Sequence, residues 1–270
     1  MGVFYVMGVV HGLLVNSLIK ELPITRIYVF GMATVGIAAW VYRAFLFRLF
    51  NPQLEYVVTK HDSKGSGITQ IELKNEGLKM KYYAGQFAFF TFPGLSQREQ
   101  HPFTISSHPD AETVRITVKD LGDYTNKMAD AIAVGDKALV EGPYGQFSAE
   151  FITENSQVWV AGGIGITPFL ALLNEIGDKE IHLFWCVTDR KEAVYFDEIQ
   201  KYSNRNKNFK CTIWSSSENG FITAQDIYRP HDNCAYMLCG PSALKTSIRN
   251  GLIRLGVKNA LIHEEEFAFR

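Results

Sequence analysis

A glycine-rich turn between an expected strand and an expected helix is the part of this sequence best suited to binding a phosphate. Val158 to Ala161 is expected as a buried strand; three glycines follow between Gly162 and Gly165, and Thr167 and Pro168 come next. Threonine is a favoured N-cap and proline is favoured at the first helical position, so a helix is expected to begin here. Its free N–H groups and its dipole favour a pyrophosphate. The spacing is not G-x-G-x-x-G, and a tight turn without a ligand is the alternative.

A second turn of the same kind follows a later strand. Cys239, Gly240 and Pro241 end an apolar strand that starts at Ala235, and a helix is expected from Ser242 to Leu255. Ligands of an open parallel sheet bind at the carboxyl ends of its strands, where both turns are expected. Cys239 is suited to contact a nicotinamide ring, and the alternative is a small buried thiol.

One histidine, His11, occurs within an uncharged apolar stretch of the sequence, Val3 to Ile19. An ionisable residue within a membrane span is costly and is a functional hypothesis by default. Neutral imidazole is a ligand of haem iron, so His11 is a candidate metal ligand. No other histidine lies in either N-terminal apolar run, so this role requires a partner from elsewhere. A histidine satisfied at the membrane interface is the alternative.

Residues 1–50 are expected to form two membrane helices. The run that contains His11 is short for a span, whereas the run from Ile27 to Phe50 reaches the roughly 20 residues that a span needs. A turn from Lys20 to Arg26, which contains Pro23, would join the two helices. Basic residues after the second helix outnumber those in the turn, which predicts a cytoplasmic C-terminal part. A buried pair of soluble helices is the alternative.

Composition limits the function of the rest of the chain. The 270 residues carry a formal net charge of -1, which gives no reason to expect nucleic-acid binding. Hydrophobic residues make up 47% of the chain, which is typical of folded domains. The spacing of the cysteines matches neither a zinc site nor an iron–sulfur cluster, and reduced thiols are expected. They are Cys186, Cys211, Cys234 and Cys239.

Short strands separated by turn residues predict a small antiparallel barrel over residues 51–150. One helix is expected within it, from Thr125 to Ala133, because Met128, Ala129 and Ile132 share a face. The expected strands are Glu55–Lys60, Ile68–Lys74, Gln86–Phe92, Val114–Lys119 and Lys137–Glu141.

Alternating strands and helices predict a doubly wound parallel sheet over residues 151–270. Besides the elements around the glycine turns, strands are expected at Ile181–Val187 and Lys210–Trp214, and helices at Pro168–Ile176 and Ala193–Tyr202. The predicted fold class is therefore multidomain, α+β and α/β, with two membrane helices, an antiparallel barrel and a parallel sheet.

Four motifs in order resemble those of the ferredoxin-NADP reductase superfamily, and within it the NADPH oxidase and ferric reductase branch. They are His101–Ser106, Gly122–Thr125, Gly142–Phe147, and the Gly162–Pro168 turn together with Cys239–Pro241. The resemblance covers residues 55–270, and the two N-terminal helices resemble the last two of the branch's membrane domain. It implies a barrel that binds FAD, a sheet that binds NADPH or NADH, and hydride transfer between the two cofactors.

The resemblance also implies roles for single residues. Thr104 would place its hydroxyl near flavin N5, and His101, Pro102 and Phe103 would line the flavin. Thr125, at the start of its helix, would meet the FAD pyrophosphate, a role compatible with an ordinary cap.

Two interpretations are open for each of the other motifs. The Gly142–Phe147 turn would lie near the nicotinamide nucleotide or simply join the two domains. Phe269, the penultimate residue, would stack on the flavin or be a core residue at a strand end. The acidic run Glu264–Glu266 is expected as solvated surface rather than a metal site. Arg190 near Thr188 favours the 2′-phosphate of NADPH, whereas the neighbouring Asp189 would bind a ribose hydroxyl of NADH.

The function expected from these features is that of a multi-pass membrane flavoprotein that passes electrons from NAD(P)H through FAD to haem, oxygen or ferric iron. The family's membrane domain holds haem between paired histidines, and His11 resembles the last of them. The alternatives are a membrane-anchored diaphorase without haem and a non-catalytic fragment. The residues expected to be catalytic are Thr104, Cys239 and Phe269, and those expected to bind cofactors are His101, Pro102, Phe103, Thr104, Ser106, Lys119, Gly122, Thr125, Gly142, Pro143, Gly145, Gly162, Gly163, Gly165, Thr167, Pro168, Thr188, Arg190, Cys239, Gly240 and Pro241.

Overall fold

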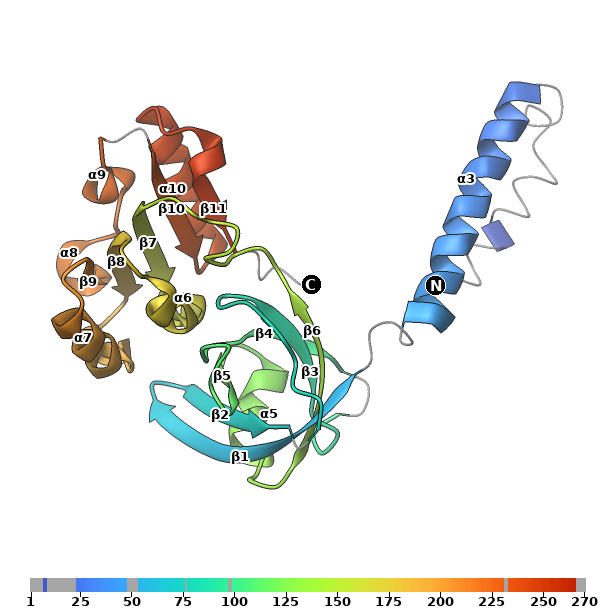
Figure 1. The fold of residues 1–270 in the computed structure, drawn as a ribbon, viewed down its shortest axis with the longest axis horizontal. Helices are drawn as coiled ribbons and strands as arrows, with labels where there is room; N and C mark the ends of the chain where they lie inside the picture. The colour runs from blue at the N-terminus through green and yellow to red at the C-terminus, as the bar shows by residue number, and fades with distance from the viewer. Residues whose placement is uncertain are drawn as a thin grey trace. The chain divides into compact units, whose positions relative to one another are not determined.

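The structure, a computed structural model, describes residues 7–8, 23–47, 53–75, 77–96, 99–230 and 233–265 (Figure 1). The chain divides into two compact units, Met1–Gln53 and Leu54–Arg270. The larger unit contains two separate β-sheets, one antiparallel and one parallel.

The smaller unit is described mainly through one long helix. α3 spans Pro23–Val41 and continues into a π-helical turn, η1, at Tyr42–Leu46. The 20 residues Ile27–Leu46 form, among the described residues, the one helix that is long and apolar enough to cross a membrane. The first expected helix, including His11, lies almost wholly outside the described residues, so a pair of membrane helices is not confirmed.

Six antiparallel strands form the first sheet of the larger unit, in the order β4-β3-β6-β1-β2-β5. A bridge between Ile105 and Ile116 joins the end of β4 to β5, which closes the sheet into a barrel. The helix α5, Asp123–Ala131, follows β5. The strands are β1 Leu54–Gly65, β2 Ile68–Lys74, β3 Phe87–Thr91, β4 His101–Thr104, β5 Val114–Lys119 and β6 Lys137–Tyr144.

The alternation of side chains along a strand accounts for the core of the barrel. In β5, Val114, Ile116 and Val118 are buried in one apolar cluster, and the residues between them face the other way. Met128 of α5 is fully buried in the same cluster. The barrel core is therefore built by one face of each strand and one face of α5.

The second sheet has five parallel strands in the order β11-β10-β7-β8-β9, as the alternating strand and helix pattern predicts (Figure 1). The strands are β7 Ser156–Gly162, β8 Glu180–Val187, β9 Phe209–Ser215, β10 Cys234–Cys239 and β11 Ile262–Glu264. The longer helices between them are α6 Thr167–Leu172, α7 Phe196–Arg205 and α10 Ser242–Arg254. Short elements complete this part: η2 Gly163–Ile166, η3 Leu173–Glu175, η4 Arg190–Glu192, α8 Ser216–Asn219, α9 Ala224–Ile227 and η5 Asn259–Leu261.

Helices cover both faces of the parallel sheet, which makes it doubly wound. Met237 of β10 packs in an apolar cluster with residues of α6 and α7, and its neighbour Tyr236 packs in a second cluster with residues of α9 and α10. Because successive side chains of a strand point to opposite faces, these two clusters lie on opposite faces of the sheet.

Several element boundaries differ from the sequence-based expectation. Pro23 begins α3 instead of lying in a turn, because the missing N–H of proline costs nothing at the first helical position. Thr167 is not an N-cap: the turn Gly163–Ile166 is already helical, so the helix α6 continues from it without a free start. Residues 101–104 form a strand that we expected only as a motif, and β11, α8 and α9 were also not expected.

Candidate cofactor-binding site

The two glycine turns pack directly against each other at the carboxyl ends of β7 and β10. A Cβ added to Gly165 would lie 2.6 Å from the carbonyl carbon of Cys239, and one added to Gly240 would lie 2.8 Å from Cα of Gly162. A Cβ on Gly162 would meet Pro241 Cδ at 2.7 Å. The missing side chains of Gly162 and Gly165 therefore leave space for the neighbouring turn, and a contact of these two glycines with a cofactor stays a prediction.

The exposed side of this turn is formed by Gly163. Its φ is +54°, and no heavy atom lies within 4 Å of the position that a Cβ would take. Its carbonyl accepts a hydrogen bond from Trp185 Nε1 at 2.9 Å, which holds the turn on the neighbouring strand β8. The open face of Gly163 is where backbone N–H groups and a phosphate can approach each other, so this edge fits a nucleotide.

The thiol of Cys239 points into the core and not toward the open edge. Its side chain is 1% exposed and packs in the apolar cluster that contains Ala161 and Ile166. Burial raises the pKa of the Cys239 thiol well above its usual value, so the thiol is neutral. A contact of Cys239 with a nicotinamide stays a prediction.

On the barrel, Thr104 ends β4 and pairs with Phe87 of β3. It is 5% exposed, and its hydroxyl makes no hydrogen bond to any residue that the structure describes. The backbone beside it is fixed, because the N–H of Ile105 donates to the carbonyl of Gln86 at 3.0 Å. A held backbone with an unused hydroxyl fits a cofactor atom that accepts a hydrogen bond, as expected for flavin N5.

The beginning of β4 is joined to α5 by stacked rings. The imidazole of His101 lies 3.6 Å from the ring of Tyr124, centroid to centroid, with 23° between their planes. His101 Nε2 also lies 3.3 Å from Glu99 Oε2. Phe103 contacts Phe90 of the barrel core at 6.1 Å between centroids. We did not expect Tyr124 at this site, although it lies inside the Gly122–Thr125 motif.

The start of α5 uses Thr125 for its own capping. The Thr125 hydroxyl accepts hydrogen bonds from the N–H groups of Leu121 and Gly122, at 3.0 and 3.1 Å. The N–H groups of the first turn remain available to an anion, as at other helix N-termini. A contact of Thr125 with a pyrophosphate stays a prediction, and the backbone of the same turn is the better donor.

The motif Gly142–Phe147 meets the C-terminal strand segment. Gly145 has a φ of +95°, and a Cβ there would lie 3.2 Å from Phe87 Cδ1 and 3.8 Å from Glu265 Oε1. Glu265 is 5% exposed, and Lys245 Nζ donates to its carbonyl oxygen. The expectation that the acidic run is solvated is therefore wrong for Glu265, because its backbone extends the sheet beside Leu238.

The carboxyl ends of β8 and β9 form a polar rim. The hydroxyl of Ser215 donates to the carbonyl of Thr188 at 3.1 Å, and Asp189 Oδ1 accepts from the N–H of Lys191 at 2.9 Å. Arg190 Nε lies 3.0 Å from Glu218 Oε2. A hollow of about 280 Å³ next to this rim is lined by Arg190, Ala193, Val194, Phe196, Asp197 and Ile213. Both an arginine and carboxylates are present here, so the choice between NADPH and NADH stays open.

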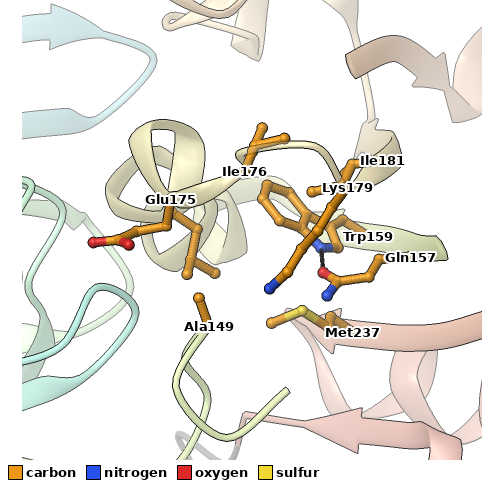
Figure 2. A pocket seen from close by; sticks show the side chains of 9 residues that line it. Ala149, Gln157, Trp159, Glu175, Ile176, Lys179, Ile181 and Met237 are labelled. Atoms are coloured by element: carbon orange, nitrogen blue, oxygen red, sulfur yellow. Dashed lines mark hydrogen bonds between the residues drawn. The ribbon is translucent and has the colours of Figure 1, made fainter. Parts of the chain in front are cut away.

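A second cavity, between the parallel sheet and α6, is too small for a cofactor. Figure 2 shows it between Trp159, Ile176 and Met237; its volume of about 10 Å³ is enough for about one water molecule. Inside it, Trp159 Nε1 donates to Gln157 Oε1 at 2.8 Å. This cavity is a packing defect of the core and not a part of the site.

The remaining predicted residues are engaged elsewhere or lie outside the described chain. Lys119 pairs with Glu192 at 3.3 Å, and the Ser106 hydroxyl donates to the carbonyl of Arg115 at 3.0 Å, so both side chains have protein partners. Phe269 and His11 lie outside the described residues. Within the described ranges, no group of three or more His, Cys, Asp or Glu residues is placed to hold a metal ion.

Comparison with known proteins agrees with this division of the larger unit. Residues 56–148 match the family "FAD-binding domain", and residues 159–250 match the family "Oxidoreductase NAD-binding domain". NADPH oxidase 3 of Homo sapiens is 29% identical over 175 residues, 57% of this chain and 30% of that protein. The mitochondrial ferric reduction oxidase 8 of Arabidopsis thaliana is 39% identical over 111 residues, 37% of this chain and 15% of that protein. The chain spans less than half the length of these relatives.

A solved structure shows the same fold. The ferredoxin NADP+ reductase from Neisseria gonorrhoeae, with bound FAD and NADP, superposes with a TM-score of 0.69 at 17% identity, covering 79% of this chain and 98% of that one. Fold and sequence together define the larger unit as an NAD(P)H-dependent flavin oxidoreductase module with sites for FAD and a nicotinamide nucleotide. The larger unit therefore carries an FAD-binding domain and an oxidoreductase NAD-binding domain, and the chain is similar to NADPH oxidases and to a ferric reduction oxidase.

Proposed function

We propose that this chain takes hydride from NADPH or NADH onto FAD and passes the electrons to an acceptor at a membrane. The observation that carries the proposal is a pair of open binding features in one compact unit: the unused hydroxyl of Thr104 on the barrel and the open face of Gly163 on the parallel sheet. The first fits a flavin and the second fits a nucleotide phosphate. The domain division is proposed as 1–50, 51–150 and 151–270.

The residues of the chain would bind and orient the cofactors. The nicotinamide supplies the hydride and the flavin receives it, so no side-chain acid or base is needed for that step. Thr104 donates a hydrogen bond from a backbone that β3 and β4 hold fixed. The first turn of α5 and the turn at Gly163 supply N–H groups for diphosphates. The aromatic rings of Phe87, Phe89 and Tyr144 contact one another, and Phe87 pairs with Thr104, so these rings would shield the flavin beside Thr104 from water.

The membrane location and the acceptor rest on the N-terminal unit and on the relatives. The segment Ile27–Leu46 is long and apolar enough to cross a membrane. NADPH oxidases and a ferric reduction oxidase are among the relatives, which supports oxygen or ferric iron as the final acceptor. For a route in which haem carries the electrons from FAD to the acceptor, His11 is the proposed ligand of the haem iron. The proposed location is a multi-pass membrane protein with cytoplasmic reductase domains.

The experiment is an anaerobic visible titration of the full chain, purified in detergent and supplied with FAD. Flavin absorbance is expected to appear with the protein and to bleach on addition of NADH or NADPH, and the nucleotide that bleaches it at the lower concentration is the natural donor. A chain that binds no FAD, or whose flavin neither nucleotide bleaches, contradicts the proposal. A Soret band that is lost in His11→Ala supports a haem ligand, whereas a parent chain without the band contradicts that role.

A further inference from the structure

The strand β5 has two functions, one on each face. The residues on its inner face build the barrel core, as described above. The residues on its outer face, which alternate with them, each contact a side chain of the segment 192–198, which belongs to the parallel-sheet part of the same compact unit. These contacts are Arg115 Nη2 to Glu198 Oε1 at 3.3 Å, Thr117 Oγ1 to the Tyr195 hydroxyl at 2.9 Å, and Lys119 Nζ to Glu192 Oε2 at 3.3 Å.

The central contact of these three is buried. Tyr195 is 4% exposed and Thr117 is 5% exposed. The Tyr195 hydroxyl also donates to Gln70 Oε1 of β2 at 3.1 Å, so it is held by two neighbouring strands of the barrel. Burial raises the pKa of Tyr195, which keeps the phenol protonated and able to donate. The outer ion pairs are partly exposed, and pairs of that kind contribute little.

The segment that carries Tyr195 begins at the nucleotide end of the sheet. It follows β8 and contains Thr188 and Arg190 before it reaches Tyr195. The carbonyl of Tyr195 accepts the N–H of Ile199 at 3.0 Å and so opens α7. The same short connection therefore forms the proposed nucleotide rim and the contact with the barrel.

We propose that Tyr195 is a positioning residue that sets the orientation of the nicotinamide-binding half against the flavin-binding half. The inference rests on the proposed function. A hydroxyl that is held from two strands fixes both a distance and a direction between the halves. Because a displacement of about 1 Å at the reacting centre costs about 100-fold in rate, this orientation matters more for the rate than for the binding of either cofactor.

The test combines kinetics with a measurement that needs no cofactor. Tyr195→Phe removes only the hydroxyl and keeps the packed ring, and Thr117→Val removes its partner at almost the same volume. Tyr202→Phe is the matched control: Tyr202 lies on α7, the helix that Tyr195 precedes, packs against Phe209, and its hydroxyl bonds to none of the described residues. Thr117→Ser keeps the hydroxyl and is expected to behave as the parent.

In stopped-flow reduction of the FAD-loaded full chain, Tyr195→Phe and Thr117→Val are each expected to slow flavin bleaching by about tenfold, with FAD and nucleotide dissociation constants changed by less than about twofold. In the FAD-free chain, amide exchange in β5 and in residues 190–195 is expected to become about three- to tenfold faster, the factor that one hydrogen bond contributes. The double variant should be little worse than Tyr195→Phe, because that single variant already removes the bond between Tyr195 and Thr117 together with the bond to Gln70.

The outcomes separate this inference from the proposed function. If the parent chain binds FAD and is reduced, but Tyr195→Phe shows unchanged exchange and an unchanged rate, the inference is wrong. It is also wrong if FAD affinity falls in step with the rate, because Tyr195 would then act through flavin binding. If the parent is not reduced by either nucleotide, the proposed function fails, while the exchange measurement still shows whether Tyr195 couples the two halves.

Discussion

The barrel and the parallel sheet prepare their cofactor sites by different means. In the sheet, Gly162, Gly165 and Gly240 pack against the opposite turn, and the backbone at Gly163 is the proposed binding surface. In the barrel, side chains such as Thr104 and His101 stand on a strand whose backbone is fixed by its neighbours. The difference teaches that a substitution at the sheet's turns should damage folding, whereas one at the barrel motif should damage cofactor binding or rate alone.

The largest effect is expected for Gly165→Ala. Its new Cβ would collide with the backbone of Cys239, which no side-chain movement can relieve, and the free energy of unfolding should fall by about 3 kcal/mol. Chemical denaturation followed by circular dichroism measures this. Gly163→Ala is the control in the same turn: its Cβ meets open space, and only the positive φ costs about 1 kcal/mol. Equal losses in the two variants would contradict the packing of the two turns.

On the barrel, Thr104→Val should slow flavin reduction by NADH or NADPH by about tenfold, because it removes the proposed hydrogen bond to the atom where the flavin gains charge. The free energy of unfolding of the FAD-free chain should stay nearly unchanged, since the hydroxyl bonds to no described residue. Stopped-flow absorbance and chemical denaturation measure the two quantities. Thr104→Ser keeps the hydroxyl and should be reduced at the parent rate. Slow flavin reduction in Thr104→Ser would show that the methyl group of Thr104 matters instead.

A smaller effect is expected for Tyr124→Leu. It removes the ring that stacks on His101, so the imidazole loses its fixed orientation beside the proposed flavin site. FAD affinity, measured by quenching of flavin fluorescence, should weaken about three- to tenfold, in line with the roughly 0.5–1.5 kcal/mol of an aromatic pair. Tyr124→Phe keeps the stack and should bind FAD as the parent does. If both variants weaken binding equally, the hydroxyl and not the stack is responsible.

The smallest effect is a pH dependence that belongs to the sheet alone. Burial on β8 lowers the pKa of His182 from 6.5 to about 4, and the nearby Lys210 and Arg229 add to this shift. The unfolded chain therefore binds a proton that the folded chain does not, and stability should fall as the pH drops from 6.5 toward 4. Thermal unfolding at a series of pH values measures this slope. His182→Gln should flatten it; an unchanged slope would assign it to other groups.

Sequence patterns predicted most of the fold because strand period and turn residues are local signals. The strands Ile68–Lys74 and Val114–Lys119 were predicted to the residue, since each is bounded by turn residues and packs one apolar face. β11 was not predicted, because three residues carry too little periodicity, and its pairing with β10 is decided by tertiary contact.

The site was predictable in its motifs and less so in its partners. The glycine turns and residues 101–104 were found from residue type and order. The packing of Gly162 and Gly165 against the second turn could not be predicted, because that turn, which fills the space beside them, is distant in the sequence. Tyr124, Glu265 and Tyr195 were missed for the same reason: each is an ordinary residue locally and gains its significance from a contact made far along the chain.

The two-faced use of β5 couples correct folding to correct assembly. A shift of one residue in the pairing of β5 with β2 would turn Arg115, Thr117 and Lys119 inward and expose the apolar residues. A barrel with β5 shifted in this way would lose its apolar core, and the Thr117 hydroxyl would no longer face Tyr195. The register of β5 therefore decides both whether the barrel has a core and whether Thr117 reaches Tyr195.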